Sequence, residues 1–278
     1  MTISDLKDLN TGFSKTTDKM PVLFIGHGNP MNALYDNSFT QSLKRTGDEF
    51  INEKRPKAIL VISAHWLTDG SYVNVSPNPE IIYDFSGFPD ELYKVQYPAS
   101  GSPEYAHQTK EIISSVEETT DWGIDHGSWT VLKHMFPMAD IPVFQLSIDY
   151  PKPLQYHFDL AKQLRPLREK GVLIIGSGNI VHNLRLSFQS LRERGEEFVY
   201  DWVVEFDQWA KEKIDNRDVK SLINYKSAGE PGKLSVPTID HYVPMLYSLA
   251  LADKNENIVY THEEVTFGAM SMRCFKIG

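Results

Sequence analysis

The sequence predicts a single α/β domain, a three-layer sandwich in which a mostly parallel central sheet is flanked by helices. Four short apolar runs rich in valine and isoleucine recur along the chain, at 22–26, 58–64, 143–148 and 172–178. Apolar runs without polar alternation are typical of strands that are buried on both faces, as in a parallel sheet. Longer stretches of helical character separate the runs, and this alternation of strand and helix indicates the layered α/β architecture.

The elements of the first half follow from this pattern in order. The strand VLFIG at 22–26 is followed by a helix over 38–54 and by the strand at 58–64. The segment 76–102 is rich in proline and aromatic residues and predicts a long ordered loop. Loops of this length in a compact domain are usually functional.

The second half repeats the alternation. Helices are expected over 103–119, 153–170 and 196–214, and Pro103 and Pro153 stand where a first helical turn tolerates proline. The tail suggests one or two closing strands. Residues 1–20 predict a polar leader, and because no linker or repeat divides the rest, 21–278 is expected to be one catalytic domain.

Composition limits the classes of function. The 278-residue chain has a net charge of −9, which argues against a nucleic-acid partner because a phosphate backbone requires a surplus of lysine and arginine. No apolar run approaches the roughly 20 residues that cross a bilayer, so no membrane partner is expected. The start lacks the apolar core of a signal peptide, and Cys274 is the only cysteine, so the cytoplasm is the expected location. The oligomeric state stays open.

Three histidines follow apolar runs, at the expected carboxyl ends of strands: His27, His65 and His182. Ligands of open α/β sheets bind at this edge, where residues far apart in the sequence become neighbours. One such histidine alone is usually a hydrogen-bonded structural residue, but three at equivalent positions favour a shared site, because burying several imidazoles is costly. A cluster of neutral imidazoles indicates a first-row metal site and leaves zinc, iron and copper open.

Two further histidines are weaker candidates for this site. His241 precedes an expected helix, and His126 lies in an expected glycine-flanked turn. The glycines of GHG fit close approach of a metal to the backbone, or are plain turn glycines. The run GSGN at 176–179 lacks the full pattern of a phosphate-binding loop, which argues against a nucleotide. The other histidines are expected on helix or tail surfaces: His107, His134, His157 and His262.

Seven segments, in order along the chain, resemble one family from about residue 20 to the C-terminus. They are FIGHGNPMNAL, VISAHW, YDFSGFPDELYKVQYPASG, DHGSWTVL, PVFQLSID, GSGNIVHNL and DHYVPMLY. On these segments the chain resembles the DOPA-type extradiol ring-opening dioxygenases, which belong to the class III, LigB-like extradiol dioxygenases.

The resemblance implies a mononuclear non-haem metal enzyme that uses O2 to open a catechol ring beside its hydroxyls. It implies Fe(II) for activity and Zn(II) in purified protein, because zinc binds such ligands more tightly. His27 and His65 match the family's metal histidines, and His241 takes the place of the third ligand. His182 matches a histidine regarded either as acid/base or as a further ligand, and His126 matches one beside the substrate.

The third ligand and the substrate stay open at this point. The wider class supplies a glutamate where this chain has His241, and Asp240 beside it is the alternative carboxylate. A DOPA-like substrate would give a seco-DOPA-type semialdehyde, but no lysine or arginine can be assigned to its amino-acid end. The 76–102 loop is either a lid or a static cover. Five aromatic residues either stack on the catechol or fill the core: Trp66, Tyr83, Phe85, Phe88 and Trp129.

Two other functions compete with ring cleavage. A zinc-dependent hydrolase would need a carboxylate base near the metal, and only Asp240 and Asp125 are candidates by neighbourhood. A metal-binding relative of the same fold without enzymatic activity is the third hypothesis. The presence of all five candidate histidines favours catalysis.

Overall fold

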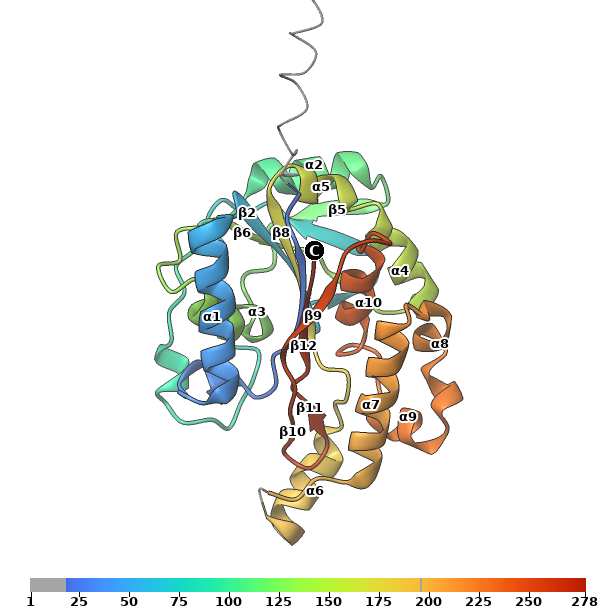
Figure 1. The fold of residues 1–278 in the computed structure, drawn as a ribbon. Coiled ribbons are helices and arrows are strands. Elements are labelled where there is room, and N and C mark those ends of the chain that lie inside the picture. Colours follow the sequence, from blue (N-terminus) through green and yellow to red (C-terminus); the bar gives the residue numbers. More distant parts are fainter. Residues whose placement is uncertain (1–18, 196) are drawn as a thin grey trace, which may run out of the picture.

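The computed structural model describes residues 19–195 and 197–278. Its centre is a six-stranded sheet in the order β6–β2–β8–β1–β12–β9 (Figure 1). Neighbours among the first four strands are parallel, whereas β12 and β9 are antiparallel to their neighbours, so the predicted mostly parallel sheet is confirmed. The strands are β6 (Val143–Gln145), β2 (Ala58–Ser63), β8 (Val172–Gly178), β1 (Val22–Gly26), β12 (Cys274–Ile277) and β9 (Ile258–His262).

The central strands are buried on both faces, as their uninterrupted apolar sequences predict. In β1, Val22 and Phe24 belong to one hydrophobic cluster, while Leu23 and Ile25 belong to the other. Successive side chains of a strand point to opposite faces, so this alternation marks two cores with the sheet between them.

Helices cover the two faces and complete the three layers (Figure 1). On one face lie α1 (Ser38–Glu53) and α3 (His126–Met135). The other face packs against α4 (Leu154–Lys162), α5 (Arg165–Glu169), α7 (Asp201–Asp215) and α10 (Val243–Ala250). The described part of the chain contains no helix that is long and apolar enough to span a membrane.

The remaining elements surround this sandwich. Helix α6 (Leu184–Arg194) meets the hairpin of β10 (Val265–Thr266) and β11 (Met270–Ser271), where Phe188 packs against Phe267. Two small parallel pairs, β3–β7 and β4–β5, lie outside the main sheet. The strands of these pairs are β3 (Leu67–Thr68), β4 (Ser71–Asn74), β5 (Val116–Thr119) and β7 (Ile148–Asp149). The remaining helices are α2 (Pro103–Ile112), α8 (Val219–Ile223), α9 (Glu230–Ser235), η2 (Pro30–Ala33), η3 (Leu92–Lys94) and η4 (Tyr225–Ala228).

Two predicted elements each turn out to be two. The helix expected over 103–119 ends at Ile112, and its last four residues form β5, because pairing with β4 buries Val116. The strand expected over 143–148 is β6 only up to Gln145, and the chain then leaves the main sheet so that β7 pairs with β3.

Of the other three predicted helices, the one over 38–54 is confirmed as α1 and two are wrong in part. The helix over 153–170 is divided into α4 and α5, because Pro166 lacks an N–H and its ring crowds the preceding turn. The helix over 196–214 begins only at Asp201, since Val199 and Tyr200 are extended and bond to Gly268, and residue 196 lies outside the described residues. Helix α6 was not anticipated.

Both ends of the described chain pack into the domain, where Met20 and Ile277 are buried. Residues 1–18 of the predicted leader lie outside the described residues, but Met20 is buried and its N–H donates to the carbonyl of Arg168. The tail supplies both β9 and β12 to the sheet and adds the β10–β11 hairpin.

Candidate metal centre

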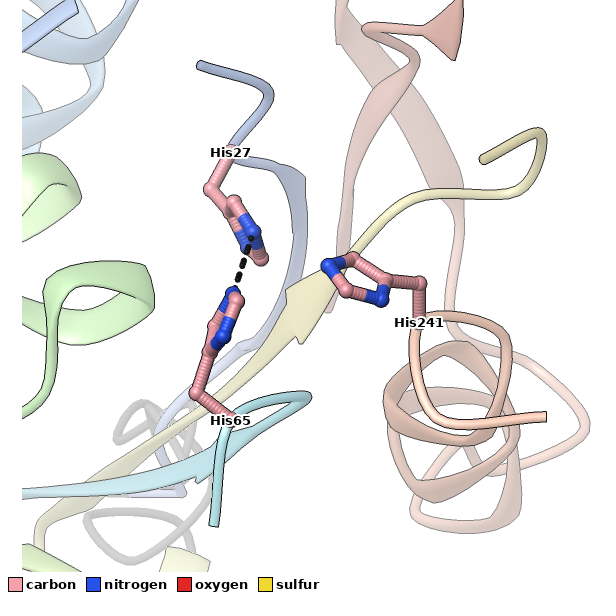
Figure 2. A group of neighbouring side chains, drawn as sticks. All are labelled: His27, His65 and His241. Carbon is pink, nitrogen blue, oxygen red and sulfur yellow. Dashed lines mark hydrogen bonds between the residues drawn. The ribbon is translucent and has the colours of Figure 1, made fainter. Parts of the chain in front are cut away.

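The fold gathers histidines from distant segments at one edge of the sheet. His27 follows β1 and His65 follows β2, while His241 lies just before α10. Figure 2 shows the rings of these three residues converging on one space from three separate segments. His182, which follows β8, stacks on His241 with ring centroids 3.5 Å apart. His126 lies beside them, 3.8 Å from the ring of His65.

Three of these imidazoles meet closely enough to share an ion. One ring nitrogen from each of His27, His65 and His241 lies within 4.8 Å of the others. The Nε2 atoms of His27 and His65 are 3.1 Å apart, which is the contact drawn dashed in Figure 2. Two nitrogens bound at about 2.1 Å from one ion and at a right angle would lie about 3.0 Å apart.

The hydrogen bond of His27 fixes which of its nitrogens is free. Ser177 Oγ donates to the carbonyl of Gly127 at 2.5 Å, so its single proton is used there. Its oxygen therefore accepts from Nδ1 of His27, at 3.0 Å. The proton of this imidazole is thus on Nδ1, and its Nε2 carries a lone pair.

Carboxylates fix the other rings in the same way. Oδ2 of Asp240 accepts from Nδ1 of His241 at 2.5 Å. Oδ2 of Asp84 lies 3.1 Å from Nδ1 of His65 and 2.9 Å from Nδ1 of His126, while its Oδ1 accepts from the backbone N–H of His126. Since an ionised carboxylate can only accept, all these imidazoles hold their proton on Nδ1.

This arrangement fits a divalent metal ion. His27, His65 and His241 each direct an unprotonated Nε2 into one small space, where the lone pairs would repel one another without a cation between them. Metal-binding histidines usually bond their second ring nitrogen to a carboxylate or another acceptor, as here. The donor set of imidazoles suits zinc, iron or copper and does not by itself select among them.

Burial keeps the imidazoles of His27, His182 and His241 neutral. Desolvation, reinforced by the neighbouring histidines, lowers the pKa of His27 and of His182 well below the usual value. Desolvation also lowers the pKa of His241 to about 4, although its bond to Asp240 acts in the opposite direction. A neutral imidazole is the form that binds a metal or accepts a proton.

The two carboxylates stay ionised. Burial by itself would raise the pKa of Asp84, but the hydrogen bonds from His126 and His65 hold it far below its usual range. Burial and the bond from His241 act in the same opposed way on Asp240, whose pKa is also lowered. Two negative charges therefore lie behind the rings, one hydrogen bond from their Nδ1 atoms, and would partly offset a divalent cation between the Nε2 atoms.

Glycines permit this close packing, although not in the way that the sequence suggested. A Cβ atom at Gly127 would lie 2.7 Å from Ser63 Oγ and 2.8 Å from Cδ2 of His65. Gly28 has a φ of 66°, and a side chain there would clash with Met272 rather than with a ligand. The glycines beside His27 thus serve the turn and the C-terminal segment, whereas the glycine after His126 leaves room for the rings.

A cavity of about 320 Å³ opens from the histidines toward solvent. Of the five aromatic candidates, Phe85 and Phe88 line it, while Trp66 and Trp129 are buried in the core. The hydroxyl of Tyr83 donates to the carbonyl of Val95, and its ring packs against the second core. The residues that line the cavity are His27, Gly28, Asn29, Pro30, His65, Asp84, Phe85, Ser86, Phe88, His126, His182, Leu184, Phe188, His241, Phe267 and Met270.

Some residues differ from their predicted setting. His126 does not lie in a turn: it is the first residue of α3, capped by Asp125. His157 is fully buried instead of exposed, because α4 packs it against Tyr247. His182 groups with Asp240 and His241, not with the three convergent Nε2 atoms.

Sequence reasoning missed Asp84 and Ser177 as partners of the histidines. Asp84 stands in the quoted aromatic segment YDFSGFP, and Ser177 in GSGN. The only signal in the sequence was a polar residue inside each of these segments, because the bonds to His65 and His27 exist only after folding.

Comparison with known proteins gives consistent similarities. Residues 20–271 match the family model described as the catalytic LigB subunit of aromatic ring-opening dioxygenase. The chain is 42% identical to 4,5-DOPA dioxygenase extradiol of Escherichia coli (strain K12), over 95% of this chain and 96% of the relative. It is 36% identical to 4,5-DOPA dioxygenase extradiol of Beta vulgaris, over 91% and 94% of the two chains. A crystal structure of an uncharacterized Escherichia coli K12 protein has a TM-score of 0.79 and 39% identity, covering 94% of this chain and all of that one.

Proposed function

Because the chain belongs to the family of the catalytic LigB subunit of aromatic ring-opening dioxygenases, we propose that it opens a catechol of the DOPA type with O2. The chain is an extradiol dioxygenase that acts on a small aromatic molecule and O2. The proposed product is a seco-DOPA-type semialdehyde. The printed names of the relatives from Escherichia coli and Beta vulgaris support DOPA as the type of substrate.

One observation carries the proposal: the unprotonated Nε2 atoms of His27, His65 and His241 face one another within 4.8 Å. These three residues would hold a mononuclear metal ion, with Fe(II) as the active form and Zn(II) in purified protein. Bound ferrous iron would supply the redox-active centre at which catechol and O2 exchange electrons.

The chain's other residues would bind the substrate and move its protons. The lowered pKa of His182 keeps its imidazole neutral, which suits a base that removes a proton from a catechol hydroxyl. His126 donates from Nδ1 to Asp84, which leaves its Nε2 as an acceptor for the other hydroxyl. Phe85 and Phe88 line the same cavity and would contact the flat faces or edges of the ring.

The hydrolase hypothesis has little support in the geometry. The carboxylate of Asp125 is buried and accepts hydrogen bonds from Ser63, Ser128 and Gln145, so it is not available as a base. Asp240 is bonded to His241. Asp125 is therefore occupied at both oxygens, and the ionised Asp240 is engaged through Oδ2 in orienting His241.

Two remaining proposals concern extent and location. The family match over 20–271 supports a catalytic domain over 21–278, preceded by a leader. Cys274, the only cysteine, is buried and free, which supports a reducing compartment such as the cytoplasm.

The decisive test is oxygen consumption with a panel of catechols after anaerobic loading with Fe(II). We expect uptake of O2 and a yellow ring-opened product with the iron form, no uptake with the zinc form, and none with His27→Ala. Hydrolysis of esters or amides by the zinc form, without O2 uptake by the iron form, would contradict the proposal.

Removal of the metal should also lower the thermal stability. An ion that binds only the folded state stabilises it by about 2.7 kcal/mol at a hundred times its Kd. For a chain of this size we expect Tm to rise by roughly 5–10 °C on adding Zn²⁺ to chelator-treated protein. Differential scanning fluorimetry measures this shift, and His27→Ala should lose most of it.

A further inference from the structure

The cavity beside the convergent histidines holds no cationic side chain among its lining residues. Apart from the histidines, its only ionisable group is Asp84, which is already bonded to His65 and His126. An anionic group on a substrate would therefore find no countercharge within this cavity. An aromatic ring fits its phenylalanine-rich wall, whereas a charged substituent would have to leave it.

A second, larger cavity adjoins the first. It has a volume of about 570 Å³ and shares His182, Leu184 and His241 with the cavity of the convergent histidines. Two basic residues line it, Arg185 and Lys233, against a single acidic one. A substituent that runs past Leu184 would thus pass from an apolar space into one with an excess of positive charge.

Arg185 lies at an electrostatically unfavourable position for a cation. It is the second residue of α6, whose first turn contains no acidic side chain, and the positive end of a helix dipole disfavours a cation there. Among the residues that the structure describes, none forms a hydrogen bond or ion pair with its guanidinium. An anion bound beside Arg185 would offset the unfavourable interaction with the helix dipole and would give the guanidinium an ion-pair partner.

The ammonium group of Lys233 is also available to bind an anion. Its only ion pair in the described part of the chain is with Glu230, at 4.0 Å, and both side chains are more than 60% exposed. Such a pair contributes little free energy, so it does not hold the ammonium away from a ligand. Asp240, the acidic residue of this cavity, bonds to His241, and one carboxylate is outweighed by two cations.

We propose that Arg185, with Lys233 in the same cavity, binds the anionic end of the substrate's side chain, so that the preferred substrates are catechols whose substituent bears a carboxylate. The catechol ring lies in the inner cavity beside His182, and the substituent extends past Leu184. Arg185 is then a specificity-determining residue that contacts the substrate at a distance from the reacting ring. This inference rests on the proposed function, since it assumes that the inner cavity holds a catechol.

Binding to the Fe(II)-loaded protein under strictly anaerobic conditions tests this without turnover. Two probes of similar size differ in charge: 3-(3,4-dihydroxyphenyl)propanoate and 4-ethylcatechol. At low ionic strength we expect calorimetry to show the carboxylated probe binding about ten-fold more tightly than the neutral one. Arg185→Gln should reduce this ratio toward one while changing the Kd of 4-ethylcatechol less than about two-fold. Arg185→Glu should disfavour the carboxylated probe further and improve binding of the cationic probe dopamine.

The matched control is Arg192→Gln, which removes the same charge from the last turn of the same helix, outside both cavities. It should leave the ratio unchanged. Equal binding of the two probes by the wild type, or an equal loss for both in Arg185→Gln, would overturn the assignment. Failure of the proposed function is seen separately, as absence of O2 uptake with either probe.

Discussion

At the residue scale, the orientation of each imidazole depends on one acceptor at Nδ1. His27 has a neutral acceptor, Ser177, whereas His65 and His241 have charged ones, Asp84 and Asp240. A charged acceptor both fixes the ring and increases the basicity of the free nitrogen. Of the three acceptors, Asp84 orients the most rings, because one of its oxygens accepts from both His65 and His126.

We therefore expect Asp84→Asn to weaken metal binding about 10- to 100-fold. The amide has no charge and cannot accept from both Nδ1 atoms with equal strength, so the rings of His65 and His126 lose their common anchor. Competition titration of the apoprotein with Zn²⁺ or Co²⁺ measures the affinity directly.

Asp90→Asn is the matched control for this change. Asp90 lies in the same loop, is exposed and does not line the cavity beside the histidines, so the metal affinity of this variant should equal that of the wild type. An unchanged affinity in Asp84→Asn would show that the carboxylate does not support the ligands.

At the scale of elements, β8 organises the site. It lies at the centre of the sheet between β1 and β2 and ends at the convergent histidines. Its glycines have no room for a side chain, because a Cβ at Gly178 would clash with the carbonyl of His241 and one at Gly176 with the carbonyl of Pro244. The segment before α10 can therefore lie directly on the strand, where the N–H of Asn179 donates to the carbonyl of His241 at 2.8 Å.

Gly178→Ala should separate His241 from the other two ligands. Because the obstructing atom is backbone, the segment itself has to move, which we expect to destabilise the fold by about 1–3 kcal/mol and to lower the metal affinity at least about ten-fold. Urea unfolding and metal titration measure the two effects.

Gly176→Ala serves as the comparison in the same strand. It should lower the free energy of unfolding by a similar amount, because the added Cβ also clashes with backbone. The clash is with the carbonyl of Pro244, however, and not with that of the proposed metal-binding residue His241. A larger loss of metal affinity in Gly176→Ala than in Gly178→Ala would contradict the role assigned to β8.

At the scale of the whole molecule, Arg168 joins the start of the described chain to the segment between α10 and β9. Its fully buried guanidinium donates to the carbonyls of Met20 and Leu251 and forms two hydrogen bonds with Glu256, at 2.6 and 3.0 Å. Burial, the largest single influence, would raise the pKa of Glu256, but the hydrogen bonds from Arg168 and from the backbone N–H of Asp253, together with the charge of Arg168, outweigh it and lower the pKa from 4.5 to about 2. This contribution to stability is fully present above pH 4.5 and is lost as the pH falls toward 2.

Glu256→Gln should therefore destabilise the protein at pH 7 by about 2 kcal/mol, since it leaves the buried Arg168 without its charged partner. The difference between variant and wild type should shrink as the pH falls from 4.5 toward 2. Urea unfolding at pH 7 and pH 3 measures it. Glu205→Gln, an exposed position on α7, should show no such difference, and an equal effect of Glu256→Gln at both values would contradict the assignment.

Much of the architecture could be predicted from local sequence. The strands at 22–26 and 172–178 are those of the structure, because a strand buried on both faces is apolar throughout and has no helical alternative of that length. The helix over 103–119 could not be bounded in this way, since its last residues become β5 only because β4 is beside them. Helical preference is a weak signal, and a partner strand overrides it.

The sequence by itself determined the layered fold, the edge of the sheet at which His27, His65 and His182 emerge, and the family on the evidence of seven ordered segments. Only the tertiary structure decided which nitrogens face one another, that Asp84 and Ser177 orient the rings, and that Arg185 lines a cavity next to them. The physical reason is that burial and strand direction follow from residues near in sequence, whereas a hydrogen bond depends on atoms within about 3 Å that the chain brings together from remote segments.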